Sequence, residues 1–148
     1  MNKIIRKNMT DNRTKEQRRY NMQQIKGINT KPELIVRSHL FSRGFRYRLY
    51  NKTLPGKPDI VLPKYKTVIF VHGCFWHRHK DCKYSKMPRK NKKFWENKFN
   101  RNIRRDKRNN YLLRKEGWTV IVIWECQLVN KKVNKTLFKL ENKLQVKK

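Results

Sequence analysis

Acidic residues are scarce in this sequence. Ten Asp and Glu stand against 40 Lys and Arg among 148 residues, which gives a formal net charge of +30 at pH 7. Such a charge disfavours a compact fold through self-repulsion unless a polyanion is the working partner. Nucleic acid is therefore the leading candidate partner, and an anionic membrane surface is the second. Hydrophobic residues make up only 36% of the chain, so we expect a small core and a solvated arm.

Long apolar segments are also missing. No run approaches the roughly 18 apolar residues that span a bilayer, and the start of the chain holds no continuous apolar segment of the signal-peptide type. We therefore expect a cytoplasmic protein without membrane attachment. The three cysteines cannot all pair with one another, and cytosolic thiols stay reduced. Metal binding is therefore favoured over disulfides.

The order of patterns along the chain predicts one α/β domain. Residues 1–18 are expected to form a flexible basic arm, and residues 19–148 the domain. Helices are predicted at 18–27, at 31–43 behind the N-cap Thr30, at 92–116, and in the tail, where apolar residues recur at helical spacing (Val133, Leu137, Leu140 and Leu144). Strands are predicted at 45–51 and, as an antiparallel hairpin, at 59–63 and 67–72. The apolar strand at 118–125 is expected to be central in a mixed β-sheet flanked by helices.

The segment FVHGCFWHRHKDC, residues 70–82, holds three of the four histidines and two of the three cysteines. Its C-x₄-H-x₂-C spacing places Cys74, His79 and Cys82 on one loop. Cys126 follows the apolar strand, from where it could complete a tetrahedron across the sheet. Four sulfur or imidazole ligands are typical of a structural zinc site. The alternative is a set of ordinary buried thiols with an exposed histidine, but zinc is favoured because the set uses every cysteine in the chain.

Two histidines of this segment, His72 and His77, are left over. A neutral imidazole can take a proton from water near pH 7, so each is a candidate general base, although a lone histidine is more often structural. His39, on the helix predicted at 31–43, is expected to be structural.

Asp59 begins one strand of the predicted hairpin, within the motif PGKPD, and the partner strand ends in FVH. A carboxylate and a main-chain carbonyl from neighbouring strands would form an oxygen site suited to Mg²⁺. Magnesium there could polarise a phosphodiester and activate water. This is the layout of the PD-(D/E)xK nucleases, except that the second acidic residue and the lysine are missing, with Phe70, Val71 and His72 in their place.

From about Tyr20 to Leu128, the chain resembles the very short patch repair (Vsr) DNA mismatch endonucleases. The motifs that carry the resemblance are YNMQQIKGINTKPE, LPGKPD, VIFVHGCFWHRHKDC, FWENKFNRNIRRD and GWTVIVIWECQL. The resemblance implies a restriction-endonuclease-like core with an inserted structural zinc site. It also implies Mg²⁺-dependent nicking of one strand, 5′ to the thymine of T:G mismatches, which arise when 5-methylcytosine deaminates.

The resemblance also implies roles for individual residues. Asp59 and the Val71 carbonyl match the magnesium ligands, His77 the general base, and His72 a contact to the scissile phosphate. Glu33 and Asp106 match supporting acidic residues. Aromatic wedges beside the mismatch are matched by Phe75, Trp76 and Trp95, and a residue inserted from the other groove by Met22. The zinc ligands are matched by Cys74, His79, Cys82 and Cys126.

Simpler explanations exist for several of these residues. Phe75 and Trp76 could be core residues, Glu33 a carboxylate that favours a helix N-terminus, and Asp106 the partner of an arginine in a buried ion pair. The chain also departs from the family pattern. Val71 stands where threonine is frequent, and Arg78 and Lys80 stand where histidine can occur.

The expected partner is double-stranded DNA with a T:G mismatch, bound by a monomer that is functionally associated with a cytosine-5 DNA methyltransferase and mismatch-repair proteins. Two alternatives remain at this point. One is a Vsr-like nuclease that cuts matched DNA in restriction, and the other is a zinc-stapled DNA-binding protein without catalysis. Cleavage of matched and mismatched duplexes would separate the three.

Overall fold

The structure is a computed structural model that describes residues 14–24 and 27–146. Within these residues, one sheet contains strands in the order β1 (Arg48–Leu49), β2 (Ile60–Leu62), β3 (Thr67–His72) and β4 (Thr119–Trp124). The pairs β1–β2 and β2–β3 are antiparallel, and the pair β3–β4 is parallel. The helices are α1 (Lys15–Gln24), α2 (Lys31–Ser42), α3 (Lys92–Lys115) and α4 (Lys132–Gln145). The predicted α/β class with a mixed sheet is confirmed.

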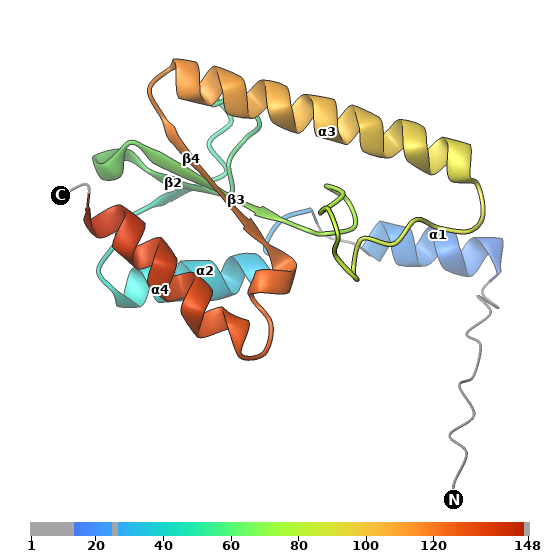
Figure 1. The fold of residues 1–148 in the computed structure, drawn as a ribbon, viewed down its shortest axis with the longest axis horizontal. Helices are drawn as coiled ribbons and strands as arrows, with labels where there is room; N and C mark the ends of the chain where they lie inside the picture. Colours follow the sequence, from blue (N-terminus) through green and yellow to red (C-terminus); the bar gives the residue numbers. More distant parts are fainter. Residues whose placement is uncertain (1–13, 25–26, 147–148) are drawn as a thin grey trace, which may run out of the picture.

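The sheet separates two helical layers. α2 and α4 cover one face, and α3 crosses the other (Figure 1). Alternate strand residues point to opposite faces. On β3, Ile69 belongs to the core under α2 and α4, whereas Val68 and Phe70 belong to a smaller core under α3. The parallel strand pair is therefore apolar on both faces.

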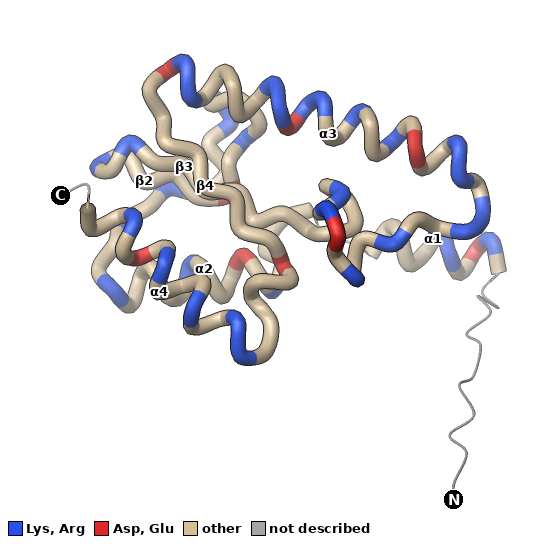
Figure 2. The backbone as a smooth tube through the Cα atoms, viewed as in Figure 1, with Lys and Arg blue, Asp and Glu red and all other residues tan. Residues whose placement is uncertain are grey.

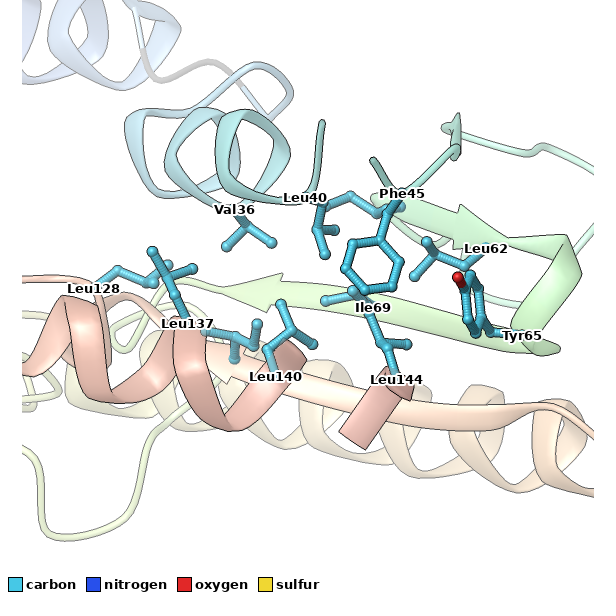
Figure 3. Packing of buried hydrophobic residues seen from close by; sticks show 12 residues of the cluster. Val36, Leu40, Phe45, Leu62, Tyr65, Ile69, Leu128, Leu137, Leu140 and Leu144 are labelled. Carbon is cyan, nitrogen blue, oxygen red and sulfur yellow. The ribbon is translucent and has the colours of Figure 1, made fainter. Parts of the chain in front are cut away.

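The larger core joins α2 and α4 to the sheet (Figure 3). Its helical members are Val36 and Leu40 of α2 and Leu137, Leu140 and Leu144 of α4. Each such buried side chain contributes roughly 1.5–3 kcal/mol relative to an exposed one. The predicted closing helix is confirmed, because the leucines that predicted it are the residues that α4 buries. The expected structural role of His39 agrees with its place 3.4 Å from Glu141, between these two helices.

The prediction that the most apolar strand is central is wrong. β4 lies at one edge of the described sheet and pairs with β3 alone. Its apolar character has another cause. Ile121 and Ile123 pack toward α4, and Val120 and Val122 pack toward α3. A continuous apolar run indicates that both faces of a strand are covered, not that both of its edges are paired.

Other differences concern element ends. The strand predicted at 45–51 is reduced to Arg48–Leu49, and α1 runs from Lys15 to Gln24 where 18–27 was predicted. α1 thus begins within the expected basic arm, whose residues 1–13 lie outside the described part of the chain. Among the described residues, no helix has the length and apolar character needed to cross a membrane.

The parallel pair β3–β4 determines where the functional residues meet. Its register pairs His72 with Trp124, so the C-terminal ends of both strands lie side by side at one end of the sheet. The loop 73–91 leaves β3 there, and the short 3-10 turn Glu125–Gln127 leaves β4 beside it. Residues that are about fifty positions apart in sequence are therefore brought together.

Candidate active site and metal centre

Three thiols and one imidazole meet beside the C-terminal ends of β3 and β4. The ligand atoms of Cys74, His79, Cys82 and Cys126 all lie within 4.8 Å of one another. His79 Nδ1 is 3.5 Å from Cys74 Sγ and 3.3 Å from Cys126 Sγ. Tetrahedral zinc, with its usual bond lengths, would hold such nitrogen and sulfur atoms ~3.6 Å apart. The donor set and its size therefore fit a closed four-ligand metal site.

Strand topology explains how Cys126 reaches the other ligands. Cys74 and Cys126 each stand two residues after the ends of β3 and β4. Because the strands are parallel neighbours, both thiols lie at the same end of adjacent strands. Cys126 therefore does not reach the site from across the sheet, as the sequence suggested. The His79 ring stacks on Trp124, with centroids 4.2 Å apart. Burial raises the pKa of Cys74 to about 12 and also raises the pKa of Cys126, so a metal ion must displace thiol protons when it binds.

His72, His77 and Asp106 form a second cluster. His77 Nδ1 lies 2.5 Å from Asp106 Oδ2. Burial alone would raise the pKa of Asp106, but its hydrogen bond with His77 and the nearby positive charges lower it below the usual value. An ionised Asp106 favours a proton on Nδ1, which leaves Nε2 to accept a proton from water. The arginine alternative is weaker, because Arg105 is 3.4 Å from Asp106 and its side chain is 58% exposed.

His72 completes this cluster as a neutral group. Its ring stacks on that of His77, with centroids 3.8 Å apart and an interplanar angle of 6°. Burial, followed by the electrostatic effect of the neighbouring His77, lowers the pKa of His72 to about 4. At neutral pH His72 is therefore an uncharged hydrogen-bonding group.

Asp59 lies beside the end of β3. Its Oδ2 accepts a hydrogen bond of 2.7 Å from the Val71 N–H. The N–H and C=O of one strand residue point the same way, so the Val71 carbonyl lies on the same side of β3. Burial raises the pKa of Asp59 to about 6, and the negative charge of Glu33 adds to the rise. A desolvated carboxylate near a carbonyl and a second carboxylate fits a hard cation such as Mg²⁺.

Glu33 is held by a network that sequence reasoning missed. Its side chain is almost fully buried, and its Oε2 accepts hydrogen bonds of 2.7–3.0 Å from three groups, which are the Tyr50 hydroxyl, the Arg37 guanidinium and the Asn29 N–H. Its Oε1 accepts from the Thr30 hydroxyl, which caps α2. A favourable interaction of Glu33 with the helix N-terminus explains its contact with the capping Thr30, but not its contacts with Tyr50 and Arg37. Tyr50 carries no local signal, because it meets Glu33 through the fold and has a left-handed backbone, with φ of 47°.

An aromatic cluster forms where the loop 73–91 meets the first turns of α3. Phe75 contacts Trp76, Trp95 and Phe99 with centroids 5.1–5.3 Å apart. Phe99 is buried, but both tryptophans and Phe75 are only half-buried. Core packing therefore explains the cluster in part, and apolar surface remains available. Met22 is placed elsewhere, on α1, where its side chain is 42% exposed.

Two polar residues that the sequence did not single out support the cluster. The Asn102 amide donates a hydrogen bond of 3.0 Å to the Trp76 carbonyl. The Lys98 ammonium lies 5.1 Å from the Trp76 ring centroid and 5.5 Å from that of Trp95. Lys98 stands three residues after Trp95 on α3, and Asn102 stands four residues after Lys98. This helical spacing was the only signal in the sequence that could have identified either residue.

Comparison with known proteins identifies the family of this arrangement. A family profile described as DNA mismatch endonuclease Vsr matches residues 10–84. The type II nicking enzyme V.XorIIP of Xanthomonas oryzae pv. oryzae is 49% identical over 120 residues, an alignment that covers 81% of this chain and 88% of the relative. The chain belongs to the Vsr DNA mismatch endonuclease family.

Further relatives agree with the Vsr assignment. The DNA mismatch endonuclease Vsr of Escherichia coli is 40% identical over 120 residues, which cover 81% of this chain and 76% of that protein. The catalytic domain of the homing endonuclease I-Bth0305I matches the structure with a TM-score of 0.54 at 20% identity, over 80% of this chain and 96% of that domain. This last likeness concerns the fold alone, and it confirms the restriction-endonuclease-like core expected of a Vsr protein.

Proposed function

We propose that the protein is an Mg²⁺-dependent endonuclease that nicks one strand of duplex DNA 5′ to the thymine of a T:G mismatch. The observation that carries the proposal is the hydrogen-bonded pair of His77 and Asp106, close to the partly buried Asp59, in a chain of the Vsr family. The relatives named as nicking enzymes support cleavage of one strand, and the relative named as a mismatch endonuclease supports the choice of substrate.

The proposed chemistry divides hydrolysis among few groups. Asp59 and the Val71 carbonyl would hold Mg²⁺, which when bound polarises the scissile phosphate and stabilises the leaving oxygen. His77 Nε2 takes the proton of the attacking water, and Asp106 stabilises the charged imidazole that results. His72, neutral at pH 7, offers a hydrogen bond to a phosphate oxygen. Valine in place of threonine at position 71 leaves this arrangement intact, because only a main-chain atom is used.

The thiol cluster has a supporting part in the proposal. Zinc bound by Cys74, His79, Cys82 and Cys126 would fix both ends of the loop that carries His77. A catalytic base must be held in place to within a fraction of an ångström. The sulfur-rich ligand set suits zinc and not magnesium, so the two metals would be sorted by ligand type.

Selectivity for the mismatch is assigned to the aromatic cluster. Phe75, Trp76 and Trp95 would enter the base stack beside the mismatch, with Met22 entering from the opposite groove. A mismatched pair costs less to unstack than a matched pair, and each contact of a base with an aromatic ring adds about 1–3 kcal/mol. Since T:G mismatches follow from deaminated 5-methylcytosine, the proposal includes a functional association with a cytosine-5 methyltransferase and mismatch-repair proteins.

A cleavage assay on paired duplexes tests the proposal. Purified protein with Mg²⁺ should nick the thymine strand of a T:G duplex and leave the same duplex with T:A intact. Asp59→Ala should abolish nicking while zinc content and DNA binding persist. Equal cutting of both duplexes would instead indicate a nuclease for matched DNA. Binding without cleavage in any divalent metal would indicate a DNA-binding protein without catalysis.

A further inference from the structure

A pocket outside the two ligand clusters lies between α3 and the loop that leads to Asp59. It has a volume of about 610 Å³. The loop contributes Lys52, Leu54 and Pro55 to its lining, and α3 contributes Arg104, Arg108 and Leu112. Lys and Arg occur along all of α3 and also on α4 (Figure 2), so positive charge alone does not mark a site. This pocket is distinguished because cations from two separate elements face one hollow.

The two walls of the pocket are held in fixed positions. Gly56 has a left-handed backbone with φ of 75°, and a Cβ added there would lie 2.9 Å from Asn109 Nδ2 on α3. The loop therefore approaches the helix as closely as glycine allows. A turn closed by a hydrogen bond from Lys57 N–H to the Leu54 carbonyl, of 3.1 Å, shapes the loop at the same point. Asp59 follows three residues after Gly56, so the pocket and the catalytic carboxylate share one support.

The lining has the chemistry of a binding site for a sugar–phosphate backbone. The rim is cationic, because Lys52, Arg104 and Arg108 are exposed, and within the described part of the chain the guanidinium of neither arginine has a hydrogen-bond or ion-pair partner. The floor is apolar and half-buried, formed by Leu54, Pro55 and Leu112. Guanidinium groups match phosphate oxygens in a fork geometry, and an apolar floor suits the face of a deoxyribose. A single carboxylate, that of Glu116, shares the lining.

We propose that this pocket binds a backbone phosphate of the strand that is cut, a few nucleotides from the scissile phosphate. The choice of strand rests on the proposed function and on two links to the catalytic residues, which are the loop that continues to Asp59 and the contact of Arg105, also in the lining, with Asp106. Phosphate contacts fix the register of a protein on its duplex. At the helical rise per residue, Arg104 lies about 14 Å and Arg108 about 20 Å along α3 from the wedge residue Trp95. The helix would thus hold the strand at one point while the aromatic cluster opens the stack at another.

Neutral phosphate substitution locates such a contact. A set of T:G duplexes, each with one methylphosphonate in the strand to be cut, is bound without Mg²⁺ by four proteins. These are the wild type, Lys52→Ala, the double variant Arg104→Ala/Arg108→Ala, and the control Lys139→Ala, which removes an exposed cation from α4 in the opposite layer. Arg105 is left unchanged because it contacts Asp106. Zinc content verifies that each exposed-site variant is folded.

The wild type and Lys139→Ala should lose about tenfold in affinity at one phosphate, the expected size for a charged hydrogen bond. Lys52→Ala and the double variant should both lose clearly less than tenfold at that same phosphate, since each already lacks part of the cationic contact that the neutral group removes. Their plots of log affinity against log salt should also be shallower by about 0.9 for the lost phosphate contact. Variants of the two walls that map to different phosphates, or to none, would overturn the proposal.

The same measurements separate this proposal from the proposed function. The pocket contacts backbone and no base, so the loss of salt dependence should appear on matched T:A duplexes as well. If the wild type nicks neither duplex but both walls map to one phosphate, the proposed function fails and the pocket stands. If T:G nicking occurs and the walls map to different phosphates, the pocket fails and the function stands.

Discussion

His77 and His79 stand two residues apart in one loop, yet their surroundings suit them to different work. Both rings stack on a flat neighbour at an interplanar angle of 6°, His77 on His72 and His79 on Trp124. The difference lies at Nδ1. In His79 it faces two thiols, and in His77 it faces a carboxylate. Thiols complete a soft ligand set that a metal can close, whereas a carboxylate leaves the other nitrogen of the ring available for a proton.

The chain turns between these two histidines. Arg78 has a left-handed backbone, with φ of 50°. Its guanidinium lies 5.0 Å from the Phe99 ring centroid on α3 and donates a hydrogen bond to the Ser85 carbonyl. Arg78 therefore ties the loop to α3 at the point where the two environments separate. The arginine at this position therefore has a packing role in this chain.

The largest effect is expected from breaking the thiol environment. Cys126→Ala should release one equivalent of zinc and unfold the domain, because structural zinc contributes about 10–16 kcal/mol of apparent binding free energy in small domains. Metal analysis and thermal unfolding measure both effects. His77→Ala is the matched comparison, since it should keep its zinc. A Cys126→Ala protein that lacks metal and is as stable as the wild type would show that the cluster is a set of ordinary thiols.

The second effect tests the carboxylate environment. His77→Ala should lower the nicking rate by about 10²–10⁴-fold, the usual contribution of a general base, with T:G binding and zinc content close to wild type. Single-turnover nicking with saturating protein isolates this step from binding. Full activity in His77→Ala would assign the base to another group, and His72 is the neighbour to test next.

Asp106→Asn should have a smaller effect in the same direction. The asparagine keeps the shape of the side chain but no longer fixes the proton on His77 Nδ1 or stabilises the charged ring. The loss should be about 10–100-fold, the range found when the carboxylate partner of a metal-bound histidine is removed. The pH dependence of the nicking rate should change together with its maximum. A merely structural role of Asp106 would lower the rate without changing its pH dependence. An equal loss at every pH would argue that Asp106 acts by packing alone.

Much of the thiol site could be predicted from the sequence, but less of the catalytic site could. Cys74, His79 and Cys82 could be grouped by spacing, because all three lie on one short loop. Cys126 could be added by elimination, although its route to the site depends on the parallel β3–β4 pair, which no local pattern shows. Asp106 could be named through the family resemblance alone, and its contact with His77 spans 29 residues. The Tyr50 and Arg37 contacts to Glu33 were missed, since tertiary packing alone creates them.

The position of β4 shows a related limit. A run of five consecutive apolar residues, 120–124, predicted a strand, and β4 is one. They report that the strand lies between two helical layers, and they contain no information about which hydrogen-bonding edges are occupied. The family resemblance could supply functional roles for residues that periodicity could not rank, but it could not supply the network around Glu33 or the pocket beside Asp59.

The smallest expected effect is on the free energy of unfolding, because the folded protein keeps the Asp59 carboxylate desolvated when no cation is bound. Burial raises its pKa from 3.8 to about 6, so above pH 6 the folded protein holds a desolvated charge that the unfolded chain solvates. Asp59→Asn removes that charge and should stabilise the Mg²⁺-free, zinc-loaded protein at pH 7.5 by about 1–2 kcal/mol, which discounts the full shift for partial exposure and a weaker hydrogen bond to Val71. Below pH 6 the wild-type carboxyl takes up a proton in the folded state, so the difference should shrink and vanish near pH 4. Urea unfolding at several pH values measures this, with the exposed Glu96→Gln as a control that changes stability by less than about 0.5 kcal/mol. A gain that is independent of pH would mean that the amide packs better, and not that the carboxylate is strained by its charge.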